Sequence, residues 1–449
     1  MMHTGAPQPG ADGVTYPRPS LAWQILLTLF LATVVSYMDR GIIALLVPDL
    51  KAEFALTDTQ VSFVQGLAFS AFFALGSIPV GHLVDRTNRR NIVIFGVSFW
   101  SCATMACGLA QSFPQLLMAR AGVGLGEACL IPAAYSMVAD CFTPQRRGRA
   151  MSLIVAGTAV GGVLSNGLGG LLLKAFSGRD HVVMPLLGDM EVWRFVFLVF
   201  GASGAILVLL LLAFSEPARR IENIAVMQDQ SAGGSRFFPY LKATPFLFIA
   251  VFAVVSLVFT ASSVTSLWVL VGLVRVHHLE MSDAGILTGA VHLASYVVGS
   301  LVGGVIGDVL ARVAPRYGRL NMWLYGIPMF AVGGILLVWP GSLVAYMFGI
   351  WLISFVGAAT AGSAYPILYD IVPADLRGRS VAYCITIANL VSFGLGPTLP
   401  ALLNDRVFYN EGMIHYSLMI VVACASLIAF VLTLAVRNRF ARAKAALVC

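Results

Sequence analysis

Apolar runs long enough to cross a membrane recur along the whole chain, and they restrict its fold more than any other feature. A transmembrane helix needs about 20 predominantly apolar residues. Such runs occupy residues 21–47, 59–82, 92–110, 113–139, 150–175, 193–214, 245–271, 284–308, 320–338, 343–371, 380–403 and 416–436. The 449-residue chain is 59% hydrophobic and 11% charged, whereas soluble domains carry about 25% charged residues. The sequence therefore predicts an all-α membrane protein with twelve transmembrane helices.

The apolar runs divide into two sets of six. The longest polar interruption, residues 215–240, separates the sixth run from the seventh. Residues 81–85 and 304–308 share a Gly-x-x-x-Asp pattern 223 residues apart, and Arg-Gly-Arg at 147–149 returns 230 residues later at 377–379. We expect two pseudo-symmetric six-helix halves, 1–214 and 241–449, joined by a cytoplasmic linker at 215–240. Transporters with such repeats hold substrate near the midplane and work by alternating access.

Lys and Arg are concentrated in the loops on the side of the N-terminus. Because cytoplasmic loops retain these residues, we expect both termini to be cytoplasmic and the protein to lie in the plasma (inner) membrane. The net charge of +7 follows from this topology, so nucleic acid is not an expected partner, although anionic membrane lipid is.

No enzyme signature is visible in the sequence. It contains no nucleophile–base pair or phosphate-binding loop, and the seven cysteines show no metal-ligand spacing. We therefore expect no enzymatic activity, no metal and no cofactor. We also expect a monomer.

Four charged residues lie inside predicted spans: Asp39, Arg40, Arg120 and Glu127. A charge near the bilayer centre costs about 2.5–3.5 kcal/mol on insertion scales, so such residues usually face a protein interior or a water-filled path. At about 1.5 Å per residue, Arg40 and Arg120 lie roughly 10–12 Å below the outer end of their helices, and Glu127 lies about 21 Å below it. The two cations and two carboxylates are therefore predicted to share one buried site.

Residues 81–90, Gly-His-Leu-Val-Asp-Arg-Thr-Asn-Arg-Arg, resemble the signature of the major facilitator superfamily between helices two and three. Residues 116–120, Gly124 and Ala128 resemble its helix-four pattern. Within the superfamily, residues 37–40, 47–50 and 124–128 resemble the Spinster family of lysolipid and sphingosine-phosphate transporters. The resemblance implies the major facilitator fold, in which the first and fourth helices line a central cavity.

Two departures limit this resemblance. Helix five lacks the Pro of the antiporter signature, and the second copy of the loop signature keeps Asp308 while its basic residues are displaced to Arg312 and Arg316.

The loop signature is interpreted as a cytoplasmic gate. Asp85, at a helix end, can accept hydrogen bonds from a neighbouring helix terminus and pair with Arg149 or Arg86 in one conformational state only. The same gate is assigned three further residues, Gly81, Arg90 and Asp308. The alternative is that the arginines serve only to orient the chain in the membrane.

The four buried charges suit an anion transporter coupled to protons. The planar fork of Arg matches phosphate or carboxylate, so Arg40 and Arg120 are the predicted headgroup ligands, held by Asp39 and Glu127 when the site is empty. Desolvation disfavours a charged carboxylate and a neighbouring Arg favours it, so either acid could load and release a proton. The alternative is a static neutral cluster that fixes helix packing.

The second half carries no charged residue at the expected midplane of helices seven, eight, ten and eleven. Its polar groups are scattered among apolar side chains, which suits the tail of an amphiphile better than a sugar. The predicted cavity residues are Tyr37, Ser295, Tyr296, Ser363, Tyr365 and Asn389.

The predicted function is therefore transport of an amphipathic, lipid-like anion, a lysophospholipid or sphingosine phosphate, with proton coupling. A carrier of small organic anions or amphipathic drugs would use the same arginines without a long tail. A non-transporting membrane sensor is a third possibility.

Overall fold

The computed structural model describes residues 8–9, 15–176, 181–184, 188–219, 234–373 and 376–446. In this part of the chain, twelve helical segments are long and apolar enough to cross a membrane. The predicted all-α, twelve-span fold is confirmed. The chain forms two compact units, residues 1–55 with 68–223 and residues 56–67 with 224–449.

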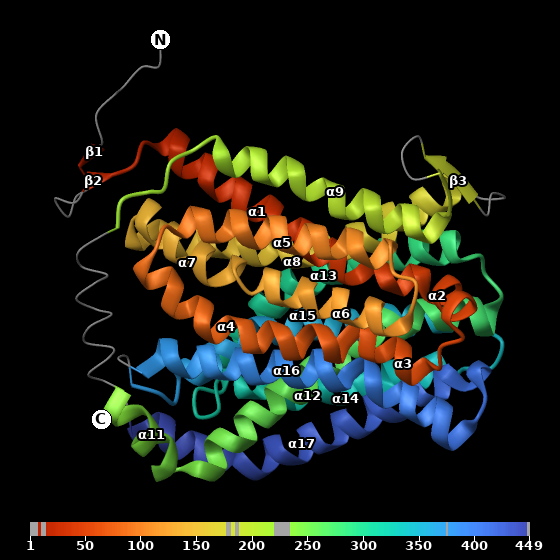
Figure 1. Ribbon diagram of the computed structural model, residues 1–449. Helices are drawn as coiled ribbons and strands as arrows, with labels where there is room; N and C mark the ends of the chain where they lie inside the picture. The colour runs from red at the N-terminus through yellow and green to blue at the C-terminus, as the bar shows by residue number, and fades with distance from the viewer. Residues whose placement is uncertain are drawn as a thin grey trace. The chain divides into compact units, whose positions relative to one another are not determined.

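The first unit contains most of the first six spans (Figure 1). Its helices and strands are β1 (Gln8–Pro9), β2 (Thr15–Tyr16), α1 (Pro19–Gly41), the 3₁₀ helix η1 (Ile42–Leu46), α2 (Val47–Phe54), α4 (Ala68–Arg86), α5 (Arg89–Gly108), α6 (Phe113–Glu127), α7 (Leu130–Cys141), α8 (Pro144–Ala175), β3 (His181–Met184), β4 (Gly188–Glu191) and α9 (Val192–Leu212). The strands pair as two antiparallel ribbons, β1 with β2 and β3 with β4.

The second unit contains the last six spans together with the beginning of the second span. Its elements are α3 (Asp58–Ser62), the π-helical turn η2 (Phe63–Leu67), α11 (Gly234–Ala243), α12 (Pro245–His277), α13 (Met281–Val313), α14 (Leu320–Leu337), α15 (Leu343–Tyr369), α16 (Arg377–Leu403), η4 (Asn404–Phe408), η5 (Glu411–Met413) and α17 (Ile414–Ala446).

The two units repeat one pattern of helix pairing. In the first unit, α1 packs on α8, α4 on α6, and α5 on both α6 and α9. In the second unit, the spans at equivalent positions do the same: α12 packs on α16, α13 on α15, and α14 on both α15 and α17. This correspondence supports the predicted duplication, while the exact boundaries of the halves stay a prediction. Residues 56–67, at the start of the second span, pack within the second unit although the sequence places them in the first predicted half.

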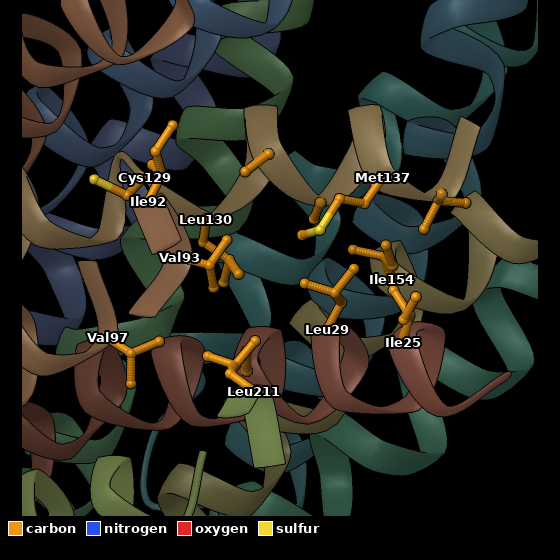
Figure 2. Packing of buried hydrophobic residues seen from close by; sticks show 14 of the residues in the cluster. Ile25, Leu29, Ile92, Val93, Val97, Cys129, Leu130, Met137, Ile154 and Leu211 are labelled. Atoms are coloured by element: carbon orange, nitrogen blue, oxygen red, sulfur yellow. The ribbon is translucent and has the colours of Figure 1, made fainter. Parts of the chain in front are cut away.

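The core of the first unit is an apolar cluster contributed mainly by α1, α5, α7, α8 and α9. Figure 2 shows Ile25 and Leu29 pointing from α1 toward Ile154 of α8 and Met137 of α7. These side chains recur at one-turn spacing, so a single face of each helix is buried. Within a membrane the lipid is equally apolar, and close van der Waals packing rather than water exclusion holds such helices together.

Several predicted spans are interrupted where the sequence predicts continuous helix. The first span changes from α to 3₁₀ geometry after Gly41, where an added Cβ would lie 2.5 Å from the Ser165 Oγ of α8. The fourth span breaks between Glu127 and Leu130. Both interruptions come directly after predicted charged site residues, and helix breaks at membrane depth commonly mark binding sites.

Candidate functional site

The buried charges of α1 and α6 form one cluster within the first unit, as predicted. Arg120 is 0% exposed, and Asp39 and Glu127 are each 1% exposed. The side chain of Arg40 is 14% exposed. Arg40 is therefore the member of the cluster that an incoming molecule can reach most directly in this structure.

Arg40 and Glu127 form the closest ion pair of the cluster. The Nε and Nη2 groups of Arg40 both approach Oε2 of Glu127 at 2.6 Å. The hydroxyl of Ser36, one helical turn before Arg40, donates to the same oxygen at 2.6 Å. The other oxygen, Oε1, is buried and accepts no hydrogen bond from the described residues. All of the donors are thus gathered on one side of the carboxylate.

Asp39 and Arg120 are more completely buried in the protein than Arg40. Thr104 of α5 donates to Oδ2 of Asp39 at 3.3 Å, and Nη1 of Arg120 donates to the main-chain oxygen of Asp39 at 3.4 Å. Oδ1 of Asp39 is buried without a hydrogen-bond donor in the described part of the chain. Each acid therefore keeps one oxygen able to carry a proton without breaking a hydrogen bond.

Aromatic rings surround the guanidinium of Arg40. Its Cζ atom lies 4.4 Å from the ring centroid of Tyr37, 4.5 Å from that of Phe69 and 5.2 Å from that of Phe73. The Cζ of Arg120 lies 5.8 Å from the Phe69 ring. Cations are attracted to ring faces at these distances.

Glycines of α6 bring these groups together. A Cβ at Gly124 would lie 2.3 Å from the main-chain oxygen of Phe69, and a Cβ at Gly126 would lie 2.8 Å from the main-chain nitrogen of Trp100. Only glycine permits this approach of α4 and α5 to α6. The glycines next to Glu127 therefore have a packing role that explains part of the sequence pattern.

Sequence reasoning identified the four charges but missed their neighbours Ser36, Thr104, Phe69 and Phe73. Ser36 could have been found, because its spacing of four residues from Arg40 places both on one face of α1. The other three lie on α4 and α5, and the spacing of residues in the sequence does not show which faces of these helices meet α1 and α6.

The predicted cavity residues of the second unit occupy varied environments. The hydroxyls of Ser295 and Ser363 are buried and donate to main-chain oxygens of their own helices at 3.0 and 2.7 Å. Tyr296 and Asn389 are half-buried, and the side chain of Tyr365 lies outside the described residues. Their place in a substrate cavity stays a prediction.

The predicted gate at the end of α4 contacts the beginning of the predicted linker in this structure. Among the described residues the exposed Asp85 carboxylate has no ion pair, so the expected pairing with Arg86 or Arg149 is not formed. Arg219 instead donates to the main-chain oxygens of residues 84, 85 and 87. A guanidinium has five donors, enough to satisfy several exposed carbonyls of one helix end.

The other predicted gate residues are also placed by the structure. Arg90 donates to the main-chain oxygen of Phe214 at 2.6 Å, and Asp308 pairs with Arg319 at 2.9 Å. Gly81 has open space where a Cβ would lie. Whether these residues gate transport stays a prediction.

Arg89, one of the arginines of the loop signature, forms the centre of a buried polar network. It is 1% exposed, pairs with Asp140 and Glu216, and donates to Ser136 at 3.0 Å and the main-chain oxygen of Pro217 at 2.8 Å. The first residues of the predicted linker are therefore packed against the first unit. The linker residues 220–233 lie outside the described part.

A further ion pair with a buried carboxylate lies at the start of the second span, inside the second unit. Asp58 is 0% exposed and accepts hydrogen bonds from Nη1 and Nη2 of Arg275 at 2.7 and 2.8 Å. Asn404 donates to the same carboxylate at 2.8 Å. A Cβ at Gly66 would lie 2.2 Å from the main-chain oxygen of Phe393. Charge and close packing together fix residues 56–67 to α12, α16 and η4.

Comparison with known proteins decides the family. A model described as Major Facilitator Superfamily matches residues 29–372. The chain belongs to the major facilitator superfamily. It is therefore a multi-pass membrane protein with the fold of a transporter.

Several members of the superfamily are similar to this chain. An MFS-type efflux pump of Mycolicibacterium smegmatis is 26% identical over 344 residues, 76% of this chain and 74% of that protein. Protein spinster homolog 1 of Xenopus laevis is 31% identical over 193 residues, 42% of this chain and 36% of that protein. A probable galactarate/D-glucarate transporter of Bacillus subtilis is 24% identical over 430 residues, 88% of this chain and 89% of that protein.

A solved structure shares the fold of this chain. It is a bacterial homologue of the human lysosomal transporter Spinster in an inward-facing, unoccupied conformation. It is 24% identical, with a TM-score of 0.75, over 96% of this chain and 98% of that one. The predicted resemblance to the superfamily and to Spinster proteins is confirmed.

Proposed function

We propose that this facilitator is a secondary active transporter of an amphipathic anion, a lysophospholipid or sphingosine phosphate, moved together with protons. One observation carries the proposal: the partly exposed guanidinium of Arg40 is held by the buried carboxylate of Glu127. A phosphate or carboxylate headgroup is the natural competitor for the donors that Glu127 now occupies.

This competition couples binding of the anion at Arg40 to protonation of Glu127. A substrate anion that takes Arg40 from an ionised Glu127 leaves a buried charge unpaired, which costs about 3–5 kcal/mol. A proton on Oε1 of Glu127 removes that cost, because the neutral carboxyl releases Arg40. Proton and anion therefore favour each other's binding, which is thermodynamic linkage and leads to cotransport.

Asp39 and Arg120 have supporting roles in this scheme. Arg120 adds positive charge beneath the headgroup, and Asp39 balances it, so the empty site is neutral overall. Asp39 can also carry a proton at its free oxygen Oδ1. The lipid-like tail is assigned to the second six spans because their sequence lacks charged residues at the expected midplane.

A second candidate substrate is a small organic acid. Similarity to a probable galactarate/D-glucarate transporter over 88% of this chain favours it. The same arginines would bind one carboxylate of such an acid, without an apolar tail. An amphipathic drug is the corresponding alternative from the similarity to an MFS-type efflux pump.

Flux into proteoliposomes tests the proposal. Purified protein is reconstituted and supplied with lysophosphatidic acid, sphingosine 1-phosphate, galactarate or D-glucarate, with and without an imposed proton gradient. The proposal expects gradient-stimulated movement of the phospholipid probes. Transport of the sugar acids alone would assign the second function instead.

A further inference from the structure

Arg40 has a second set of partners besides Glu127, and they are uncharged. The rings of Tyr37, Phe69 and Phe73 lie within 4.4–5.2 Å of its Cζ atom. Phe69 and Phe73 stack on each other with centroids 5.8 Å apart and planes inclined by 22°. We call these three residues the aromatic box.

Close contacts between helices position two residues of the aromatic box, Phe69 and Tyr37. Phe69 is 3% exposed, and its main-chain oxygen lies against Gly124 of α6. Tyr37 is fixed by α8, where a Cβ at Gly161 would lie 2.7 Å from the Tyr37 Cβ. These contacts fix the helix positions from which the Phe69 and Tyr37 rings extend toward Arg40.

We propose that the aromatic box, in which Phe69 is the most buried member, positions Arg40 whenever Glu127 is neutral. A cation over an aromatic ring is attracted by the ring face, and the attraction grows as the site is desolvated. The Cζ atom of Arg40 lies over the three rings, and the N–H donors of a guanidinium point outward in its plane. The box can therefore hold the cation in place while its donors stay available to an anion.

The aromatic box and the Glu127 carboxylate differ in whether they compete with a substrate anion for Arg40. Glu127 and a substrate anion need the same donors of Arg40, so one excludes the other. The rings of Phe69 and Phe73 need none of these donors and carry no charge, so they do not compete with the anion, whereas the hydroxyl of Tyr37 also forms a hydrogen bond with Arg40. Phe69, Phe73 and Tyr37 are thus positioning residues, and their effect on transport rests on the proposed anion function.

Because both Glu127 and the aromatic box restrain Arg40, substitutions in the two should have non-additive effects on the mobility of Arg40. With Phe69→Leu alone, Glu127 still tethers the guanidinium. With Glu127→Gln alone, which resembles the protonated acid, the box still holds it. With both substitutions, Arg40 loses the carboxylate and one of its three rings at once, and keeps Tyr37 and Phe73. A merely structural Phe69 would instead give effects that add independently.

Chemical labelling of Arg40 measures this restraint without any transport assay. The arginine-selective reagent phenylglyoxal is applied to purified protein, and modification of Arg40 is followed by peptide mass spectrometry. We expect each single variant to change the labelling rate by less than about threefold, and the double variant to raise it about tenfold or more, as a loss of about 1.4 kcal/mol would. Additive rates, or no rise in the double variant, would overturn the proposal.

Three further variants exclude trivial explanations. Phe69→Tyr keeps the ring and should restore slow labelling in the Glu127→Gln background. Phe95→Leu removes half of another stacked pair, Phe95 with Phe99 on α5 at 5.9 Å, and should leave labelling unchanged. Should Phe69→Leu fail to fold, Phe73→Leu replaces it, with the same direction of effect and a smaller size.

Anion binding is measured separately on the same proteins with sphingosine 1-phosphate as the probe. Failure of the unmodified protein to bind it would contradict the proposed function and leave the labelling result standing. Normal binding with additive labelling would contradict the aromatic box alone.

Discussion

Arg40 directs Nε and Nη2 to a single oxygen of Glu127, Oε2, at 2.6 Å each. The two residues come from different helices, α1 and α6, so the pair also ties these helices together. A substrate anion that binds Arg40 through both donors must displace the carboxylate. The pair therefore predicts the consequences of neutralising either partner.

Glu127→Gln should remove the response of flux to a proton gradient while leaving counterflow exchange partly intact. The amide cannot load a proton, but Arg40 can still bind an anion. Flux into proteoliposomes with and without the gradient measures this. Glu280→Gln, an exposed acid before α13, is the matched control and should behave like the unmodified protein. A Glu127→Gln variant with full gradient-driven accumulation would show that another group couples transport.

Arg40→Lys should weaken anion binding about tenfold despite keeping the charge. Lys has one compact ammonium group and cannot present two donors in a planar fork. Calorimetric titration with sphingosine 1-phosphate compares this variant with Arg120→Lys, for which we also expect weaker binding, and with the exposed control Arg312→Lys. Unchanged affinity in both site variants would remove these residues from the headgroup site.

Much of this fold was predictable, because apolar length alone predicts a membrane-spanning helix. The four buried charges were predictable for the same reason, since the membrane makes each of them exceptional. Which charges pair was not predictable. Only the packing of α1 against its neighbours shows that Arg40 meets Glu127 while Arg120 meets the main chain of Asp39.

The structure also contains features that no single-sequence pattern predicts. The antiparallel pair of β3 and β4 lies between two predicted spans, where the sequence analysis predicts no strand. The placement of α3 and η2 in the second unit depends on Asp58, which resembles an ordinary helix-start acid in the sequence. Its partner Arg275 lies more than two hundred residues later, and only tertiary packing brings the two together.

Asp58→Asn should lower the free energy of unfolding by up to about 3 kcal/mol, because it leaves the partly buried Arg275 with only the exposed carboxylate of Glu411, at 3.1 Å, as an ionic partner. Combining it with Arg275→Met should cost less than the sum of the two single variants, since the double variant leaves no unpaired charge. Denaturation of purified protein in detergent measures both. Additive losses would indicate that the ion pair contributes nothing beyond its separate residues.

Affinity should rise with acyl chain length across lysolipids that share one headgroup. Burial of each methylene contributes about 0.8 kcal/mol until the cavity is filled. Tyr296→Asp, which places a charge on the predicted apolar wall, should flatten the series. Equal affinity for all chain lengths in the unmodified protein would favour the small-acid carrier.

Proton uptake on anion binding tests the coupling of Arg40 and Glu127 most directly. Calorimetric titration with sphingosine 1-phosphate, repeated at one pH in buffers of different ionisation enthalpy, gives the number of protons taken up by the protein per anion bound. We predict an uptake that approaches one proton per anion bound in the unmodified protein, and none in Glu127→Gln. Binding without proton uptake in the unmodified protein, or equal uptake in both proteins, would contradict the account.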